Sequence, residues 1–291
     1  MSGTPVGARD AVGLDDPVRA GAGASPADDR DQTVAQWLAW LAGERLLDLR
    51  HVRGYADPGA LRAAGDRQAH HVLRGELGRL RPGDAVLSEE DAGARGEAAA
   101  DRRAADRVWI IDPLDGTREY GEQGRTDWAV HVALWERGAG LTAGAVALPA
   151  RQVVLGTDAP PPPAAAGPMR VAVSRSRPPG FVSTLLERCG GVAVPMGSAG
   201  VKVCAVVTGE ADAYVHAGGQ YEWDSAAPVA VATAAGLHCS RLDGRPLEYN
   251  RAHPRLPDLL VCRPEHRDAL LGTLAELIKT GEVLIEEGAA G

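Results

Sequence analysis

Apolar residues in the first 80 positions recur at helical spacing in two segments. The first predicted helix begins at Thr33, and its apolar face consists of Trp37, Leu38, Leu41, Leu46, Leu47 and Leu49. A second helix is expected after Gly65, with Asp66 as its N-cap and an apolar face formed by Val72, Leu73, Leu77 and Leu80. Two amphipathic helices are therefore expected ahead of the first strand.

Short apolar runs between turn signals predict strands in the next 70 residues. RPGDAVLSEE combines a turn, a short apolar run and two acids, which is typical of a strand that ends in Glu89 and Glu90. VWIID is a continuous apolar run and predicts a buried strand, and two further strands are expected at 129–134 and 143–148. Residues 92–106 lack periodicity, so they predict a mobile loop.

The second half of the chain predicts strands that alternate with helices. MRVAVS and DLLVC predict strands, whereas FVSTLLERC, DSAAPVAVATAAG (ended by Gly236) and residues 266–279 predict helices. VKVCAVVTGEADAYV predicts a helix that leads into a strand.

Low-complexity segments divide the chain into expected domains. Residues 1–30 contain almost no large apolar residues and predict a disordered tail. The proline-rich residues 158–168 predict an extended spacer. We therefore expect an N-terminal α+β domain at 31–157 that holds the candidate metal ligands, and a C-terminal α/β domain at 169–291 that binds substrate.

Composition narrows the class of protein. The 291 residues are 45% hydrophobic but only 4% aromatic, so a core of Ala, Val and Leu with closely packed elements is expected. A net charge of -8 argues against nucleic-acid binding through a basic face. No apolar run is long enough to span a bilayer, and no secretory signal is recognisable. The four cysteines lack zinc-ligand spacing, and scattered thiols favour a cytoplasmic location.

The segment WIIDPLDGTREY is the most informative for chemistry. The buried strand delivers Asp112 to its end, Pro113 is expected to stop strand pairing, and Asp115-Gly116 is expected to form a tight turn. Asp112 and Asp115 would then face one point together with the carbonyl of Leu114. Thr117 follows at an expected helix start, where unpaired N–H groups favour an anion such as phosphate.

The oxygen donors of this segment favour a hard cation. Carboxylates, a carbonyl and a hydroxyl select Mg²⁺, Mn²⁺ or Ca²⁺ rather than zinc. Other acids could join from Glu89 or Glu90, Asp224 and Asp66, and such a set could hold two cations about 3.5–4 Å apart. The competing interpretations are a capping role for Asp66 or Asp224 and a solvated or supporting role for Glu90.

DPLDGT after an apolar strand, with SEE upstream and WDSAAP downstream, resembles the inositol monophosphatase-like superfamily of metal-dependent, lithium-sensitive phosphatases. VLSEEDAG, WIIDPLDGTREY and GSAGVK are most similar to its 3'(2'),5'-bisphosphate nucleotidases of the CysQ type. The resemblance covers roughly residues 33–272. It implies a layered α/β/α/β/α sandwich and hydrolysis of a phosphate monoester by a metal-activated water.

The same resemblance implies roles for individual residues. Two, or with a third site three, Mg²⁺ ions would be held by Glu89, Asp112, the Leu114 carbonyl, Asp115 and Asp224. Asp66 and Thr117 would orient the attacking water, and the Gly116 and Thr117 backbone would hold the phosphate. The segment that ends at Asp66 is LRAAGD here, in place of the common Thr-x-x-Asp-like pattern, which weakens the case for a third ion.

Substrate contacts are expected from Ser174, Arg175, Ser198, Lys202 and His216. Competing interpretations are a surface charge for Arg175, a solvated helix residue for Lys202 and a strand-end histidine for His216.

The resemblance implies removal of the 3'-phosphate of 3'-phosphoadenosine 5'-phosphate, with 3'-phosphoadenylyl sulfate as a second substrate, in sulfur metabolism by a monomer or homodimer. The alternatives are an inositol-1-monophosphatase or fructose-1,6-bisphosphatase of the same superfamily, and a non-catalytic metal- or nucleotide-binding regulator. The chain contains neither a GxSxG nor a GxxxxGK[ST] motif, which disfavours a serine hydrolase and a P-loop enzyme.

Overall fold

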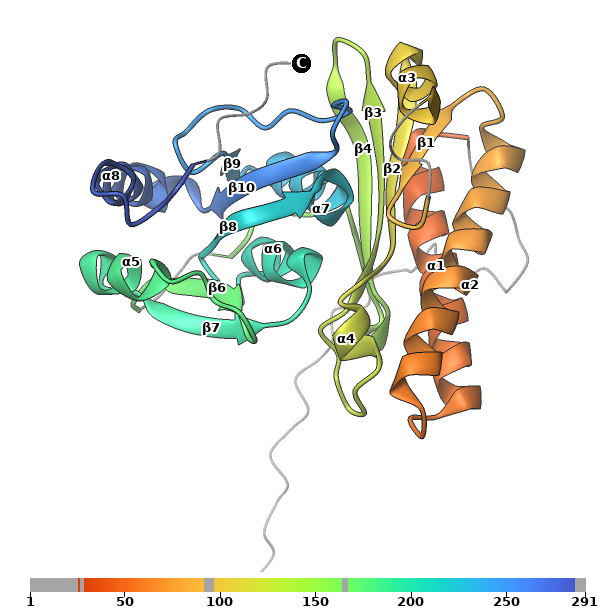
Figure 1. Ribbon diagram of the computed structural model, residues 1–291, viewed down its shortest axis with the longest axis horizontal. Coiled ribbons are helices and arrows are strands. Elements are labelled where there is room, and N and C mark those ends of the chain that lie inside the picture. The colour runs from red at the N-terminus through yellow and green to blue at the C-terminus, as the bar shows by residue number, and fades with distance from the viewer. Residues whose placement is uncertain (1–25, 27–28, 92–96, 164–166, 286–291) are drawn as a thin grey trace, which may run out of the picture.

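The computed structural model describes residues 26, 29–91, 97–163 and 167–285. Its first sheet, sheet A, has the strand order β1-β2-β3-β4-β5, in which β1 and β2 are parallel and the other pairs antiparallel. Its strands are Ala85–Ser88 (β1), Arg107–Asp115 (β2), Ala129–Glu136 (β3), Gly140–Leu148 (β4) and Val153–Gly156 (β5). Helices α1 (Asp31–Arg53) and α2 (Pro58–Leu80) cover its outer face (Figure 1).

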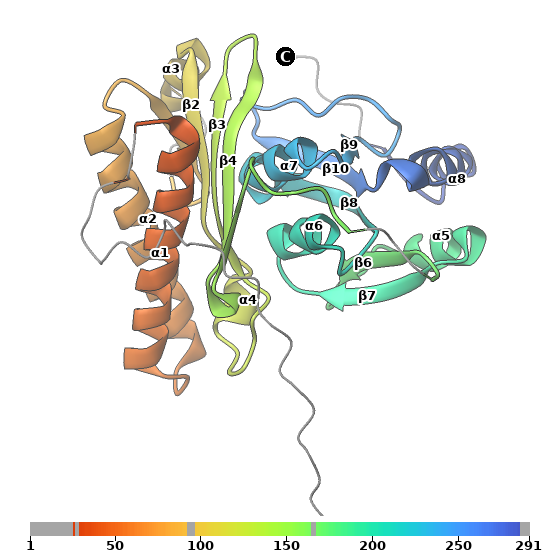
Figure 2. The same ribbon diagram turned by 180° about the vertical axis from the view of Figure 1, so that it is seen from behind.

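The second sheet, sheet B, is mixed and has the order β7-β6-β8-β10-β9. Its strands are Arg170–Ser174 (β6), Val192–Met196 (β7), Ala213–Tyr221 (β8), His238–Ser240 (β9) and Arg255–Cys262 (β10). Helices α6 (Ala199–Thr208) and α7 (Glu222–Ala234) lie between the sheets, and α5 (Val182–Cys189) and α8 (Arg267–Lys279) cover the outer face of sheet B (Figures 1 and 2). The layers run α/β/α/β/α, which confirms the fold expected from the sequence.

Strand β2 shows why the central run of the chain is continuously apolar. Val108 and Ile110 belong to the core between the sheets, which includes α6 and α7, whereas Trp109 and Ile111 belong to the core beneath α1 and α2. Because successive side chains of a strand point to opposite faces, a strand covered on both faces must be apolar at every position. A third core joins sheet B to α5 and α8.

The sequence analysis predicted the wrong start for α2 and therefore the wrong role for Asp66. The helix begins at Pro58, and its N-cap is Asp57, whose side chain accepts a hydrogen bond from the Ala60 N–H at 2.9 Å. Asp66 lies in the middle of the helix, so the prediction that it is an N-cap is wrong. Gly65 is a packing position, because a Cβ there would lie 2.8 Å from Cε1 of Tyr120.

Other local predictions had mixed outcomes. Part of the expected loop at 92–106 is a helix, α3 (Glu97–Ala104), while residues 92–96 lie outside the described ranges. Strand pairing continues past Pro113 to Asp115. The sequence analysis missed three strands, β5, β7 and β9.

The expected tail and the expected domain boundaries remain predictions. Most of residues 1–30 fall outside the described ranges, as does part of the proline-rich spacer at 164–166, whereas 158–163 has no regular secondary structure. Short helical turns complete the described chain at Thr117–Tyr120 (α4), Pro149–Arg151 and Pro264–His266. Within the described ranges, no helix combines the length and the apolar character needed to cross a bilayer.

Sheet A and α7 approach each other closely at Gly144 of β4. A Cβ at this position would lie 2.6 Å from the Cβ of Ala230 and 3.2 Å from the carbonyl oxygen of Ala227. Small residues on both elements therefore allow the middle layer to pack against the sheet, in agreement with a core poor in aromatic residues.

This close approach predicts the effect of one added methyl group. Gly144→Ala should lower the free energy of unfolding by about 2 kcal/mol, because overpacking of a tight core forces backbone shifts. Gly75→Ala, at an exposed position of α2 with nothing within 4 Å, should instead raise it by about 0.5–1 kcal/mol. Urea unfolding followed by circular dichroism measures both, and an unchanged midpoint for Gly144→Ala would contradict the packing described here.

Candidate metal centre

Three aspartates from two elements meet at the junction of the two sheets. Asp112 and Asp115 come from the end of β2 and Asp224 from the first turn of α7, and one carboxylate oxygen of each lies within 4.8 Å of the others. Asp112 and Asp115 are buried. The sequence therefore correctly expected these three acids to come together.

A β-bulge turns the two acids of β2 toward the same side. Asp112 pairs with His131 and Asp115 with Ala129, so three steps on β2 match two steps on β3. In a regular strand, side chains three residues apart point to opposite faces of the sheet. The extra residue of a bulge turns the second side chain to the same face as the first. Pro113, which has no N–H to donate, lies within this bulge.

Glu89 and Asp66 extend the acidic cluster. Because β1 and β2 are parallel, their carboxyl ends share one edge of sheet A, and the Glu89 carboxyl group lies close enough to Asp112 for each to affect the pKa of the other. Burial, followed by the nearby charge of Glu90, raises the pKa of Asp66 to about 7. The contact with Asp112 favours Glu89 over Glu90 as a member of the cluster.

Asp115 is bound by the N-terminus of α6. Its carboxylate accepts hydrogen bonds from the hydroxyl of Ser198 and from the N–H groups of Ala199 (3.2 Å) and Gly200 (2.7 Å). His131 Nε2 lies 3.2 Å from Asp115 Oδ2. Burial opposes ionisation, but the nearby His131 ring and the hydrogen bonds from Ser198 and Gly200 outweigh it and lower the pKa of Asp115 to about 2.

His131 is a functional candidate that the sequence analysis missed. It is fully buried on β3, and its Nδ1 lies 3.0 Å from the carbonyl oxygen of Trp223 on α7. Burial opposes its charge, but Asp115 raises the pKa of His131. A Cβ on Gly200 would lie 2.0 Å from its Nε2, so only glycine fits there. The one signal in the sequence was a lone histidine inside the apolar run AVHVAL.

The surroundings of the other acids in the cluster disfavour their ionised forms. Burial and then the charges of Glu89, Asp115 and Asp224 raise the pKa of Asp112 well above its usual range. Burial and then Asp115 raise the pKa of Asp224 to about 7. Glu89 is partly exposed, but the loss of hydration around its carboxyl group raises its pKa to a similar value. A cation among these hard oxygen donors would remove the repulsion, so the cluster is suited to a divalent metal ion.

The turn after β2 has the geometry that the DGT motif suggested. Gly116 has φ +87°, and a Cβ there would lie 3.1 Å from the carbonyl oxygen of Asp127 and from the Cβ of Ser198. Thr117 starts α4 as expected, although this helix has only four residues. The Thr117 hydroxyl donates to the Leu114 carbonyl at 3.1 Å, which places both groups beside the acids.

Two of the expected substrate-binding residues lie next to the cluster. Ser198 contacts Asp115, as described above. Lys202 is buried, not solvated, and its Nζ donates to the Ser198 carbonyl at 2.6 Å.

The other three expected substrate contacts have different partners. Arg175 donates to Glu119 at 2.7 Å, Ser174 accepts a hydrogen bond from the Arg177 N–H at 3.2 Å, and His216 Nε2 lies 3.2 Å from the Gly219 carbonyl. The structure thus links Arg175 to α4, whereas the hydrogen bonds of Ser174 and His216 are local.

Comparisons with known proteins point to one family. A sequence model described as the inositol monophosphatase family matches residues 32–159 and 165–279. A Mycobacterium tuberculosis protein named 3'-phosphoadenosine 5'-phosphate phosphatase is 52% identical over 244 residues, which cover 81% of this chain and 90% of that protein. The 3'(2'),5'-bisphosphate nucleotidase CysQ of Escherichia coli is 32% identical over 205 residues, 64% of this chain and 78% of that protein.

A solved structure shares the fold. CysQ from Bacteroides thetaiotaomicron, described as a bacterial member of the inositol monophosphatase family, superposes with a TM-score of 0.67 at 25% identity. The match covers 79% of this chain and 95% of that one.

The raised pKa values predict how pH affects stability without metal ions. Asp66, Glu89 and Asp224 have pKa values of about 7 in the folded chain, whereas unfolded acids titrate near pH 4. Between these values the folded state binds more protons, so the free energy of unfolding should fall as pH rises from about 4 to about 7. Urea unfolding in EDTA across this range measures the slope.

The control for this prediction is Asp112→Asn, which removes one carboxyl group whose pKa is raised in the folded chain and should therefore flatten the slope. A saturating divalent cation should stabilise the wild-type protein more at pH 7 than at pH 5, because protons compete with it for the carboxylates. A stability that rises with pH in EDTA would contradict the electrostatic description of the cluster.

Proposed function

Because this chain belongs to the inositol monophosphatase family, we propose that it is a Mg²⁺-dependent phosphatase that hydrolyses the 3'-phosphate of 3'-phosphoadenosine 5'-phosphate. The observation that supports a metal-dependent reaction is the convergence of Asp112, Asp115 and Asp224 on one point. The choice of substrate rests on the mycobacterial relative, which is 52% identical over most of both chains. The products would be adenosine 5'-phosphate and inorganic phosphate, and 3'-phosphoadenylyl sulfate is a second expected substrate.

The acidic cluster would hold two Mg²⁺ ions. Glu89, Asp112, Asp115 and Asp224 would supply carboxylate oxygens, and Leu114 its carbonyl. When bound, Mg²⁺ lowers the pKa of water and neutralises charge on the phosphate and the leaving oxygen. Asp115 is the permanently ionised member of the set, because the N-terminus of α6 and His131 hold its carboxylate.

Thr117 and Asp66 would orient the attacking water. The Thr117 hydroxyl donates its proton to the Leu114 carbonyl, so its lone pairs remain to accept a hydrogen bond from water. Asp66, with a pKa of about 7, is suited to exchange a proton near neutral pH. As the oxygen of water bonds to phosphorus, the bond from phosphorus to the 3'-oxygen breaks, and that oxygen takes up a proton.

The phosphate would rest on the backbone N–H groups of Gly116 and Thr117. Ser198 and Lys202 border the same space from α6, which brings a positive charge close to the acids. Arg175 would reach the nucleotide by exchanging its contact with Glu119, and Ser174 and His216 complete the proposed contacts. The role we infer is removal of a nucleotide by-product in sulfur metabolism in the cytoplasm, by a monomer or homodimer.

A substrate panel tests the proposed activity. With Mg²⁺ present, phosphate release from 3'-phosphoadenosine 5'-phosphate should have a higher kcat/KM than release from inositol 1-phosphate or fructose 1,6-bisphosphate. Asp112→Asn, prepared in the same way, should lose at least a thousandfold of this rate while retaining the wild-type circular dichroism spectrum. Faster hydrolysis of a sugar or inositol phosphate would move the assignment to another member of the family, and a fully active variant would refute the site.

His131 is expected to act as a positioning residue for Asp115. His131→Phe keeps the size of the side chain but removes both polar contacts, so the Mg²⁺ concentration for half-maximal activity should rise about 10–100-fold. The kcat at saturating Mg²⁺ should change much less, because the carboxylates themselves remain. His238→Phe, which changes a half-buried histidine of β9 bonded to Ser240, is the matched control and should leave the Mg²⁺ dependence unchanged. Equal Mg²⁺ dependence in both variants would assign His131 a purely structural role.

A further inference from the structure

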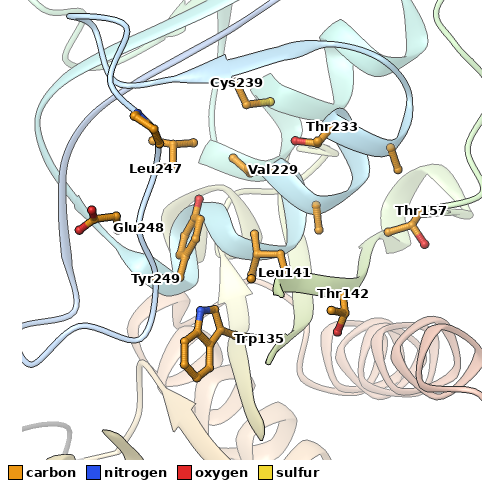
Figure 3. A pocket seen from close by; sticks show the side chains of 14 residues that line it. Trp135, Leu141, Thr142, Thr157, Val229, Thr233, Cys239, Leu247, Glu248 and Tyr249 are labelled. Carbon is orange, nitrogen blue, oxygen red and sulfur yellow. The ribbon is translucent and has the colours of Figure 1, made fainter. Parts of the chain in front are cut away.

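A cavity of about 630 Å³ lies between sheet A and the C-terminal half of α7. Its walls come from the β3–β4 hairpin, from α7, and from the loop between β9 and β10 (Figure 3). The hairpin end of sheet A is opposite the edge that carries Asp112, and Thr233 lies nine residues along α7 from Asp224, or about 13 Å. The cavity is therefore separate from the acidic cluster, and its volume is typical of sites for small molecules.

The lining of the cavity is mainly apolar and aromatic. Trp135, Leu141, Val229 and Leu247 form much of the wall, together with the ring of Tyr249. An indole and a phenol ring facing one space favour a flat aromatic occupant, because aromatic rings attract each other beyond the effect of burial alone.

The polar lining groups determine which charge the occupant can carry. Thr142, Thr157 and Thr233 contribute hydroxyl groups, which can donate or accept hydrogen bonds. Glu248 is the one charged residue among the described lining residues, and it is acidic. Its carboxylate is ion-paired with Arg251 at 2.9 Å and is mostly exposed. None of the described lining residues carries a positive charge, so a phosphate or carboxylate would lose its hydration without a cation in the wall to replace it, and this cavity does not suit the phosphorylated substrate of the acidic cluster.

The loop that closes the cavity is fixed in place. The Tyr249 hydroxyl lies 3.2 Å from the Ser225 hydroxyl. The buried carboxylate of Glu222 accepts hydrogen bonds from the N–H groups of Asn250 (2.7 Å) and Arg251 (2.8 Å). Because these bonds hold the loop against the first turn of α7, a ligand would not have to order the wall, which reduces the entropic cost of binding.

We propose that this cavity is a second ligand site, which binds an uncharged aromatic small molecule with hydroxyl, amine or amide groups. The aromatic rings stack on Trp135 and Tyr249, and the polar groups hydrogen-bond with the threonine hydroxyls. The site does not depend on the phosphatase assignment, because none of its lining residues belongs to the acidic cluster.

The test uses N-phenyl-1-naphthylamine, an uncharged aromatic amine whose fluorescence increases in apolar surroundings. Titration into the full-length protein should show saturable binding of one dye molecule per chain. The sulfonated analogue 8-anilinonaphthalene-1-sulfonate has the same ring system with a negative charge and should bind at least tenfold more weakly. Saturating 3'-phosphoadenosine 5'-phosphate with Mg²⁺ should not displace the uncharged dye.

Two variants at one position locate the bound dye. Thr142 is exposed on β4 at the wall of the cavity, so Thr142→Trp should fill the space and weaken dye binding at least tenfold, whereas Thr142→Val keeps the volume and should change it less than threefold. Both variants should retain wild-type phosphate release, which also shows that they fold. Absence of saturable binding, unchanged affinity in Thr142→Trp, equal affinity for the sulfonated dye, or displacement by the nucleotide would each overturn the proposal.

Discussion

The bond network around Asp115 connects sheet A to helix α6 of the middle layer at the point where the chemistry is expected. The carboxylate ends β2 of sheet A, and its hydrogen-bond donors begin α6 of the middle layer. A second aspartate repeats this connection, because Asp127 accepts the Gly197 N–H at 2.6 Å. A carboxylate at a helix N-terminus is stabilised by unpaired N–H groups and by the helix dipole. The position of α6 against sheet A and the charge state of Asp115 therefore have the same cause.

This arrangement divides the acids of the cluster into two kinds. Asp115 remains ionised because α6 and His131 compensate its charge, whereas Asp112, Asp224 and Glu89 are surrounded by other acids with few donors. Ser198, which donates to Asp115, has φ +51°, a conformation that is rarely adopted by residues other than glycine. Strain and unrelieved repulsion at one place are characteristic of functional sites, where the fold is less stable than it could be.

Much of the fold could be predicted because its signals are local. The apolar run of β2 and the helical spacing of α1 each describe a segment that is buried in a regular way. The start of α2 was misplaced because Gly65 suggested a boundary, whereas the structure uses this glycine for close packing against Tyr120. His131 and Gly200 could not be paired from the sequence, because they lie 69 positions apart and become neighbours only when α6 docks on sheet A. Asp112, Asp115 and Asp224 were predictable as a set, since they end a strand or start a helix, but the bulge that aligns Asp112 with Asp115 required the register of β3.

Helix α7 joins two environments that differ in their electrostatics. Its first turn supplies Asp224 to a cluster of oxygen donors, while its last turns present Val229 and Thr233 to an apolar cavity. Glu222, the first residue of α7, connects the two environments, because it precedes Asp224 by two residues and its carboxylate holds the backbone of the loop that closes the cavity. Binding of a phosphate is favourable only where cations offset the charge of the acids. Binding of an uncharged aromatic ring is favourable where the ring displaces water from apolar walls. The same helix can therefore separate two classes of ligand without a domain boundary between them, because the charge of the lining, and not its distance from the active centre, determines which molecule each end can hold.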